Sequence, residues 1–108
     1  MSTTVTIGDL PFQCDRLGVV QYDNVAAVYV IICVDDDGTW QVLDVGETGE
    51  LGDRLEGHER EDCWRDNCPG NNIWVCVYYT PSDQYSGEDR KQIESMIRKQ
   101  YNPPCGTR

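Results

Sequence analysis

The chain has 108 residues, which is enough for one domain and leaves no room for two. Hydrophobic residues make up 39% and charged residues 26% of it, a balance typical of a folded chain and not of a disordered one. Acidic side chains number 19 against nine basic ones, so the net charge is −10, and this field repels nucleic acid at long range. A surface rich in Asp and poor in Lys would also suit a salty cytoplasm, where ions screen the charge.

The hydrophobic stretches are short. The longest, Val25–Val34, has half of the about 20 residues that a membrane-spanning helix needs. The first ten residues lack the features of a secretory signal, so we expect a cytoplasmic protein without membrane contact. A reducing compartment predicts that the six cysteines are mostly free thiols without metal, with Cys33 and Cys76 as small core residues. A redox or zinc protein is an alternative, and the zinc ligands would be His58, Cys63, Cys68 and Cys105.

Residues 1–24 are interpreted as a mixed N-terminal leader. Thr3–Ile7 alternates in the manner of a short edge strand, and Pro11 and Asp15 then interrupt the pattern. The next stretch, 26–34, is apolar throughout and rich in β-branched residues, which predicts a strand covered on both faces.

A hairpin follows this strand. Three aspartates and a glycine at 35–38 predict a turn, and 39–46 returns as a second strand. Simple alternation along 39–46 predicts two faces. One face would carry Trp40, Val42 and Asp44, and the other Gln41, Leu43 and Val45.

The second half of the chain predicts two helices and a third strand. Apolar residues at helical spacing predict a helix over 50–61, followed by a polar loop at 62–72. The stretch 73–80 is the third strand, and an apolar stripe predicts a helix over 87–101. The capping residues of this last helix are Ser86 and Asp89.

Together these elements predict an α/β fold of the α+β type, in which helices flank a three-stranded, mainly antiparallel sheet. We expect the domain to span residues 25–106.

Two residues of the predicted hairpin stand out as polar groups among apolar ones. Tyr29 interrupts an apolar strand, which is also typical of a core tyrosine with its hydroxyl at the rim. Asp44 lies near a strand end, where a carboxylate also commonly accepts backbone N–H bonds.

Charged residues of the predicted helices form a second group of candidates. Arg54 and His58 are four residues apart, which makes them neighbours on one helix and also fits a plain solvated face. Glu94 borders an apolar stripe, where a purely structural glutamate would pair with Arg90 or Arg98.

The order of these residues resembles that of the GIY-YIG nuclease domain over about residues 25–106. Its two name-giving tripeptides match Ala27–Tyr29 and Asp44–Gly46. Its pattern of glycine, leucine, arginine and histidine matches Gly46, Leu51, Arg54, Leu55 and His58, and its late metal-binding glutamate matches Glu94. Small stand-alone members are also similar in having a Cys-Trp pair after the histidine and a terminal Asn-Pro-Pro-Cys, here Cys63-Trp64 and Asn102–Cys105.

The resemblance implies a divalent-metal-dependent endonuclease that hydrolyses phosphodiester bonds in DNA, with RNA as the second choice. It implies that Tyr29 touches or deprotonates the water, that Arg54 binds phosphate oxygens and that His58 assists proton transfer or holds the nucleophile. Glu94 would hold one Mg²⁺ or Mn²⁺ ion. We expect the tips of these four side chains to lie within about 10 Å of a common point. Substrate binding is assigned to Gly46, Glu47, Thr48 and Asn102.

The chain departs from the family pattern at two positions. Asp44 replaces the second tyrosine, and Gly106 stands where the family usually has an asparagine. Asp44 is a candidate replacement base or second metal ligand in an active site, where the metal or Arg54 would compensate its charge. It also fits an inactive site, so the alternative function is a silent domain of the same fold that serves in binding or regulation.

Overall fold

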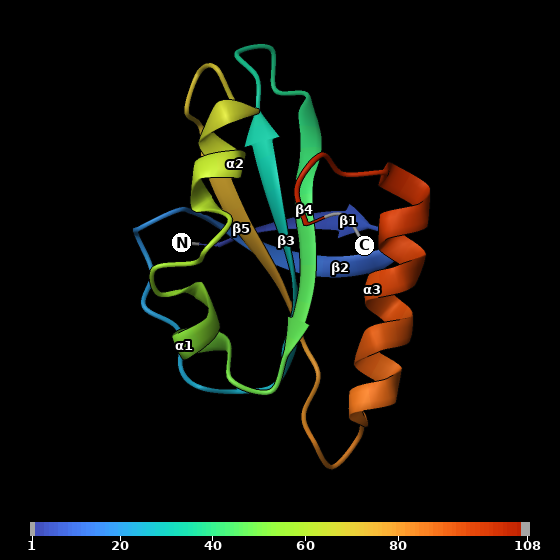
Figure 1. Ribbon diagram of the computed structural model, residues 1–108. Helices are drawn as coiled ribbons and strands as arrows, with labels where there is room; N and C mark the ends of the chain where they lie inside the picture. Colours follow the sequence, from blue (N-terminus) through green and yellow to red (C-terminus); the bar gives the residue numbers. More distant parts are fainter. Residues whose placement is uncertain (1, 107–108) are drawn as a thin grey trace.

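The computed structural model describes residues 2–106, and its most buried strand is β3 (Ala27–Val34), in which seven of the eight residues are buried (Figure 1). This strand pairs antiparallel with β4 (Trp40–Thr48) on one side and with β5 (Ile73–Tyr79) on the other. The predicted antiparallel core is therefore confirmed, and each strand end lies within two residues of its expected place.

The sheet has five strands, so the prediction of three is wrong. β1 (Thr3–Ile7) and β2 (Leu10–Arg16) form a hairpin, and β2 pairs with β5, which gives the order β1-β2-β5-β3-β4. Pro11 does not interrupt β2, because it lies opposite Thr6 and outside the paired stretch of β2 and β5, which begins at Gln13. Its missing N–H therefore removes no hydrogen bond to β5.

A β-bulge in β4 decides which way its side chains point. Asp44 lies opposite Ile31, whereas Val42 lies opposite the next residue of β3, so Leu43 is the extra residue. The predicted alternation of side chains between the two faces is therefore wrong beyond Leu43. Val45 packs with Val42 on one face, whereas Leu43 packs on the other. The bulge thereby directs Asp44 to the face of Ile31.

The single helix predicted over 50–61 is wrong, because the structure has two short helices, α1 (Leu51–Leu55) and α2 (Glu61–Asp66). The helical structure is interrupted at Gly57, whose φ of +57° lies in the left-handed region that glycine adopts without strain. Part of the predicted polar loop at 62–72 is consequently helical.

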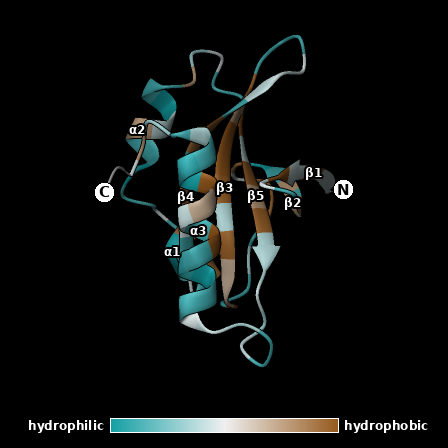
Figure 2. Cartoon of the chain, turned by 90° about the vertical axis from the view of Figure 1, so that its right-hand side faces the viewer, coloured by the Kyte–Doolittle hydropathy of each residue, from teal (hydrophilic) through white to brown (hydrophobic). Residues whose placement is uncertain are grey.

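α3 (Gly87–Tyr101) confirms the last predicted helix. The Ser86 side chain accepts from the Asp89 backbone N–H, and the Asp89 carboxylate accepts from Ser86, so the predicted capping pair is also confirmed. Figure 1 shows α3 beside the edge strand β4, and Figure 2 shows hydrophobic strands behind a largely hydrophilic outer helix face.

Each face of the sheet carries its own hydrophobic core. Tyr29, Leu51 and Trp64 belong to the core under α1 and α2, whereas Val45 and Ile97 belong to the core under α3. The two short helices and α3 therefore cover opposite faces. Within residues 2–106, the structure contains no helix of the length and hydrophobicity that crossing a membrane requires.

All six cysteines are paired in three disulfides, so the prediction of mostly reduced cysteines is wrong. The pairs are Cys14–Cys76, Cys33–Cys68 and Cys63–Cys105. This pairing also leaves no free thiolate for the zinc alternative, and His58 is committed to other hydrogen bonds. Spacing along the chain does not reveal the connectivity, because each bond joins segments that are distant in the sequence and meet only in the folded chain.

Candidate functional site

Tyr29 and Gly46 form a directly opposed pair on β3 and β4. The Tyr29 ring lies across the glycine so closely that a Cβ atom at position 46 would overlap the ring carbon Cζ and the hydroxyl oxygen. The side chain of Tyr29 is thus held flat against the neighbouring strand, and the residue is fully buried. Gly46 has a packing role here, which explains why this position needs a glycine although its backbone is ordinary.

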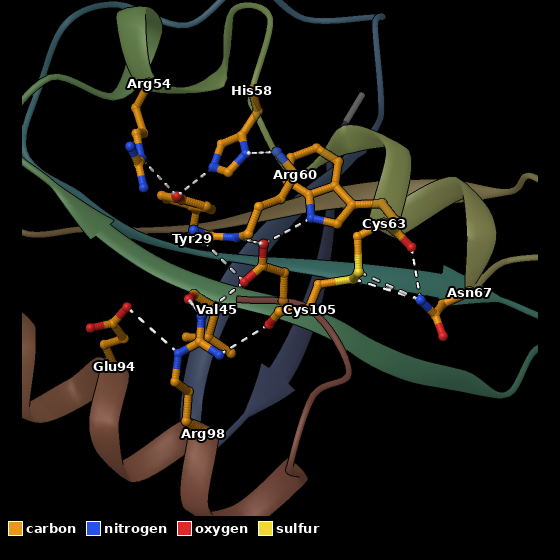
Figure 3. Close-up of polar contacts among 12 residues, drawn as sticks. Tyr29, Val45, Arg54, His58, Arg60, Cys63, Asn67, Glu94, Arg98 and Cys105 are labelled. Carbon is orange, nitrogen blue, oxygen red and sulfur yellow. Dashed lines mark hydrogen bonds and ion pairs between the residues drawn. A yellow bond between two sulfur atoms is a disulfide. The ribbon is translucent and has the colours of Figure 1, made fainter. Parts of the chain in front are cut away.

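The hydroxyl of Tyr29 is the meeting point of two side chains from the α1 region (Figure 3). The Arg54 Nε–H donates to it at 3.1 Å, and His58 Nε2 lies 2.9 Å from it. The Arg60 backbone N–H donates to His58 Nδ1 at 3.1 Å, so Nδ1 must be an acceptor and the ring proton is on Nε2. His58 therefore donates to Tyr29, and the phenolic oxygen accepts two hydrogen bonds.

Burial controls the charge of both aromatic groups. It raises the pKa of Tyr29 above its ordinary value of 10.0, and the hydrogen bond from Arg54 acts in the opposite direction. It also lowers the pKa of His58 below 6.5, and the positive charges of Arg60 and Arg54 add to this effect. At neutral pH the resting site thus contains an uncharged tyrosine and an uncharged histidine.

Arg54 and His58 reach Tyr29 from either side of the Gly57 break and not from one helix flank as predicted. Within residues 2–106, Arg54 forms no ion pair, so the charge of its exposed guanidinium is not neutralised by a carboxylate. An arginine in this state can bind a phosphate oxygen with the two nitrogens that do not contact Tyr29.

Asp44 is fully buried and is compensated by two arginines. Its Oδ2 accepts from Arg60 Nε at 2.7 Å and from the Trp64 indole at 2.8 Å, and its Oδ1 accepts from Arg98 Nη2 at 2.9 Å. The expected compensation by metal or by Arg54 is thus replaced by Arg60 and Arg98. Asp44 joins α2, β4 and α3 in one ion cluster, the Asp44 cluster, which consists of these four residues.

The segment after α3 covers the Asp44 cluster. Figure 1 shows the chain turning back from α3 across β4, where the Cys105 backbone N–H donates to the Leu43 carbonyl at 2.9 Å. Arg98 Nη1 donates to the Cys105 carbonyl at 3.2 Å. A Cβ atom at Gly106 would lie 2.7 Å from Asp44 Oδ1 and equally close to Arg98 Nη2, so the backbone there rests directly on the ions.

Glu94, the candidate metal ligand, belongs to α3 and is buried. Its Oε2 lies 3.7 Å from Arg98 Nε, one of the two pairings expected for a structural glutamate, whereas Arg90 pairs with Glu47 at 3.2 Å. Figure 3 shows Glu94 and Arg98 on one side of Val45, with Arg54 and His58 on the opposite side beyond Tyr29. Arg98 therefore connects Glu94 with the Asp44 cluster.

The other assigned substrate-binding residues have structural partners. Glu47 holds Arg90, and the Thr48 hydroxyl accepts from the Glu50 backbone N–H at 3.0 Å. Asn102 ends α3 in a left-handed conformation with φ of 49° and lines a groove of about 720 Å³ along this helix, together with Glu94.

Sequence reasoning missed three members of the Asp44 cluster, namely Arg60, Trp64 and Arg98. The Cys-Trp pair was a visible signal for Trp64, and the four-residue spacing from Glu94 was a signal for Arg98. Nothing in the sequence links Arg60 to Asp44, because their contact joins residues that are 16 positions apart in different elements.

Within residues 2–106, the structure contains no group of three or more His, Cys, Asp or Glu side chains arranged to hold a metal ion. A scan against models of known protein families, a search of curated proteins and a search of solved structures each found no match for this chain.

Proposed function

We propose that the chain is a GIY-YIG-type endonuclease that hydrolyses phosphodiester bonds in DNA with the help of a divalent metal. The observation that carries this proposal is the meeting of Arg54 and His58 on the Tyr29 hydroxyl, since these are the residue types and the order that the resemblance requires. RNA is the second choice of substrate.

The contacts support a specific division of roles. Because Nδ1 of His58 is occupied and its Nε2 donates, His58 orients Tyr29 and stabilises negative charge on it, and is not the base that deprotonates it. Arg54 assists this stabilisation through Nε and binds the phosphate through its other nitrogens. Tyr29 then accepts a proton from the attacking water once it is ionised, which its raised pKa restricts to alkaline conditions in the resting site.

Glu94 is the residue that would hold Mg²⁺ or Mn²⁺. A carboxylate oxygen is a ligand these ions accept, and one carboxylate with water and phosphate oxygens is a common Mg²⁺ site. Glu94 is almost fully buried beside Arg98, so an ion would reach its carboxylate only if this pairing opened. When bound, the ion would neutralise charge on the phosphate and on the leaving oxygen.

A catalytically silent domain that binds or regulates is the second candidate. The complete pairing of Asp44 and its cover by the chain at Gly106 favour this function, because a substrate has no direct access to that carboxylate. The net charge of −10 also favours it, since a nuclease must bind a polyanion.

The proposed location is the cytoplasm. The presence of three disulfides has to be weighed against this location. Disulfides in cytosolic proteins are uncommon and are usually transient or redox-sensing. Three structural disulfides are more typical of an oxidising compartment than of the cytoplasm, so they count against this location.

The test is a cleavage assay on single-stranded, duplex and branched DNA with Mg²⁺ or Mn²⁺ over a salt series. Tyr29→Phe should lower the cleavage rate about 100-fold or more, because it removes a group that transfers a proton. Tyr79→Phe is the matched control, since this tyrosine is exposed on β5. Equal rates for the wild type and Tyr29→Phe would refute the assigned role, and absence of cleavage under all conditions would favour the silent domain.

A further inference from the structure

The chain from Asn102 to Gly106, the C-terminal tail, is joined to α2 by a covalent bond. Cys105 of the tail forms a disulfide with Cys63, the neighbour of Trp64. The same bond therefore anchors the tail over the Asp44 cluster and fixes the helix that supplies the Trp64 indole to it. Both the tail and α2, which pack against Asp44, are thus held by one disulfide.

This disulfide is also the most accessible of the three. Cys63 is half-buried, whereas Cys105 and the four other cysteines are 5% exposed or less. A thiolate from solution can attack a disulfide only at a sulfur that it can reach. Cys63 is therefore the expected point of attack, which requires the exposed Asn67 amide, 3.6 Å from its Sγ, to move aside, and Cys105 is the leaving group.

A continuous set of contacts leads from the tail to the Tyr29 hydroxyl. Gly106 rests on Asp44, and Asp44 holds the Arg60 guanidinium at 2.7 Å. The backbone N–H of Arg60 fixes Nδ1 of His58 as an acceptor, and His58 in turn donates to Tyr29. The His58 ring also packs against Trp64, with ring centroids 4.7 Å apart.

We propose that the Cys63–Cys105 disulfide is a redox lock that holds the Asp44 cluster closed and keeps the His58 ring proton on Nε2, facing Tyr29. Opening this bond releases the tail, admits water to Asp44 and frees Arg60, so that His58 can exchange between its two tautomers. The consequence for DNA cleavage rests on the proposed function, whereas the lock itself does not.

The reaction is a reduction by a dithiol. One thiolate of the reductant attacks Cys63 Sγ, the bond to Cys105 breaks, and Cys105 leaves as a thiolate that takes up a proton. The second thiol of the reductant then displaces Cys63, which also ends as a thiol. Two electrons and two protons pass to the protein, and the reductant becomes a disulfide.

Stepwise reduction of the whole chain with dithiothreitol, followed by alkylation and mass spectrometry, tests the order of opening. We expect Cys63 and Cys105 to be alkylated before the other four cysteines. Opening of Cys14–Cys76 or of Cys33–Cys68 first would overturn the proposal.

Nuclear magnetic resonance of the same samples tests the coupling. Opening the bond should speed hydrogen exchange of the Trp64 indole N–H at least tenfold and should shift the His58 ring nitrogens towards a mixture of tautomers. The Trp74 indole donates to Asn72 at 3.0 Å outside the cluster, so it is an internal control that should not change. Unchanged Trp64 and His58 signals after opening would overturn the proposal.

Variants separate the lock from general stability. Cys63→Ala with Cys105→Ala should reproduce the reduced signals, whereas Cys14→Ala with Cys76→Ala, at the β2–β5 pair, should leave the Trp64 and His58 signals as in the oxidised protein. If a double variant fails to fold, partial reduction of the wild type decides the question. A chain that never cleaves DNA but shows these changes would refute the proposed function and retain the lock.

Discussion

Gly106 and Asp44, the two positions at which the chain departs from the GIY-YIG pattern, touch each other. A Cβ atom at position 106 would lie 2.7 Å from Asp44 Oδ1, which is closer than any side chain there can be. The carboxylate draws in Arg60 and Arg98, and their guanidinium groups fill the space beneath the tail. The glycine at position 106 therefore leaves the room that the ion cluster needs.

Gly106→Ala should therefore destabilise the protein by more than its backbone conformation accounts for. Gly38→Ala is the matched control, because Gly38 also has a positive φ but has no atom within 4 Å of the place that an added Cβ would take. We expect a loss of about 1–2 kcal/mol in the free energy of unfolding for the control and about 1–3 kcal/mol more for Gly106→Ala. Urea unfolding measures both, and equal losses would show that the tail does not rest on the cluster.

Asp44→Asn should destabilise the folded state by about 3 kcal/mol, because it leaves two partly buried arginines without their carboxylate. Asp44→Tyr should lose as much, since it also removes the negative charge. The control is Asp36→Asn in the exposed hairpin turn. Urea unfolding of the three variants tests this, and wild-type stability of Asp44→Asn would contradict the assigned role of the cluster.

Gly46→Ala should displace the Tyr29 ring, since the added methyl group would overlap its hydroxyl end. Overpacking of this kind costs about 1–3 kcal/mol. Gly70→Ala is the control, because it has open space at its Cβ and no positive φ. The chemical shifts of Tyr29 and His58 should move in the first variant only, and a Gly46→Ala protein with unchanged shifts would disprove the close packing.

Acid should destabilise the protein through its single histidine. The folded chain holds His58 neutral with a pKa below 6.5, whereas the unfolded chain takes up the proton near 6.5. The unfolded state therefore binds more protons as the pH falls below 6.5, and the free energy of unfolding should drop by up to about 1.4 kcal/mol per pH unit. His58→Gln should flatten this slope between pH 5.5 and 6.5, and an equally steep slope in the variant would refute it.

The elements that were predicted from the sequence are those with a strong local signal. Strands β3 and β5 are continuous apolar runs, and α3 has both a capping pair and an apolar stripe. β2 was not recognisable, because the effect of Pro11 depends on where the pairing with β5 begins. The prediction of one helix over 50–61 failed because Leu51, Leu55 and His58 share helical spacing across Gly57, whose left-handed conformation lies between two separate helices.

The candidate site was predictable only where the order of residues was informative. Tyr29, Arg54 and His58 meet at the Tyr29 hydroxyl, and Arg54 and His58 reach it from either side of Gly57 and not from a shared helix. The partners of Asp44 were not predictable, because Arg98 is 54 residues away along the chain and reaches it around the edge of the sheet. The bulge at Leu43, which directs Asp44 to its partners, also has no sequence signal.

The hydrogen bond from Cys105 to Leu43 also affects how copies of the chain behave towards one another. β4 is an outer strand of the sheet, and outer strands offer unpaired backbone groups that can recruit a second molecule. The tail occupies one of these groups and, with α3 alongside, obstructs strand addition at this edge. Loss of the tail would therefore expose a strand edge for self-association. The Cys63–Cys105 disulfide, which anchors the tail, should thus also reduce aggregation of the chain.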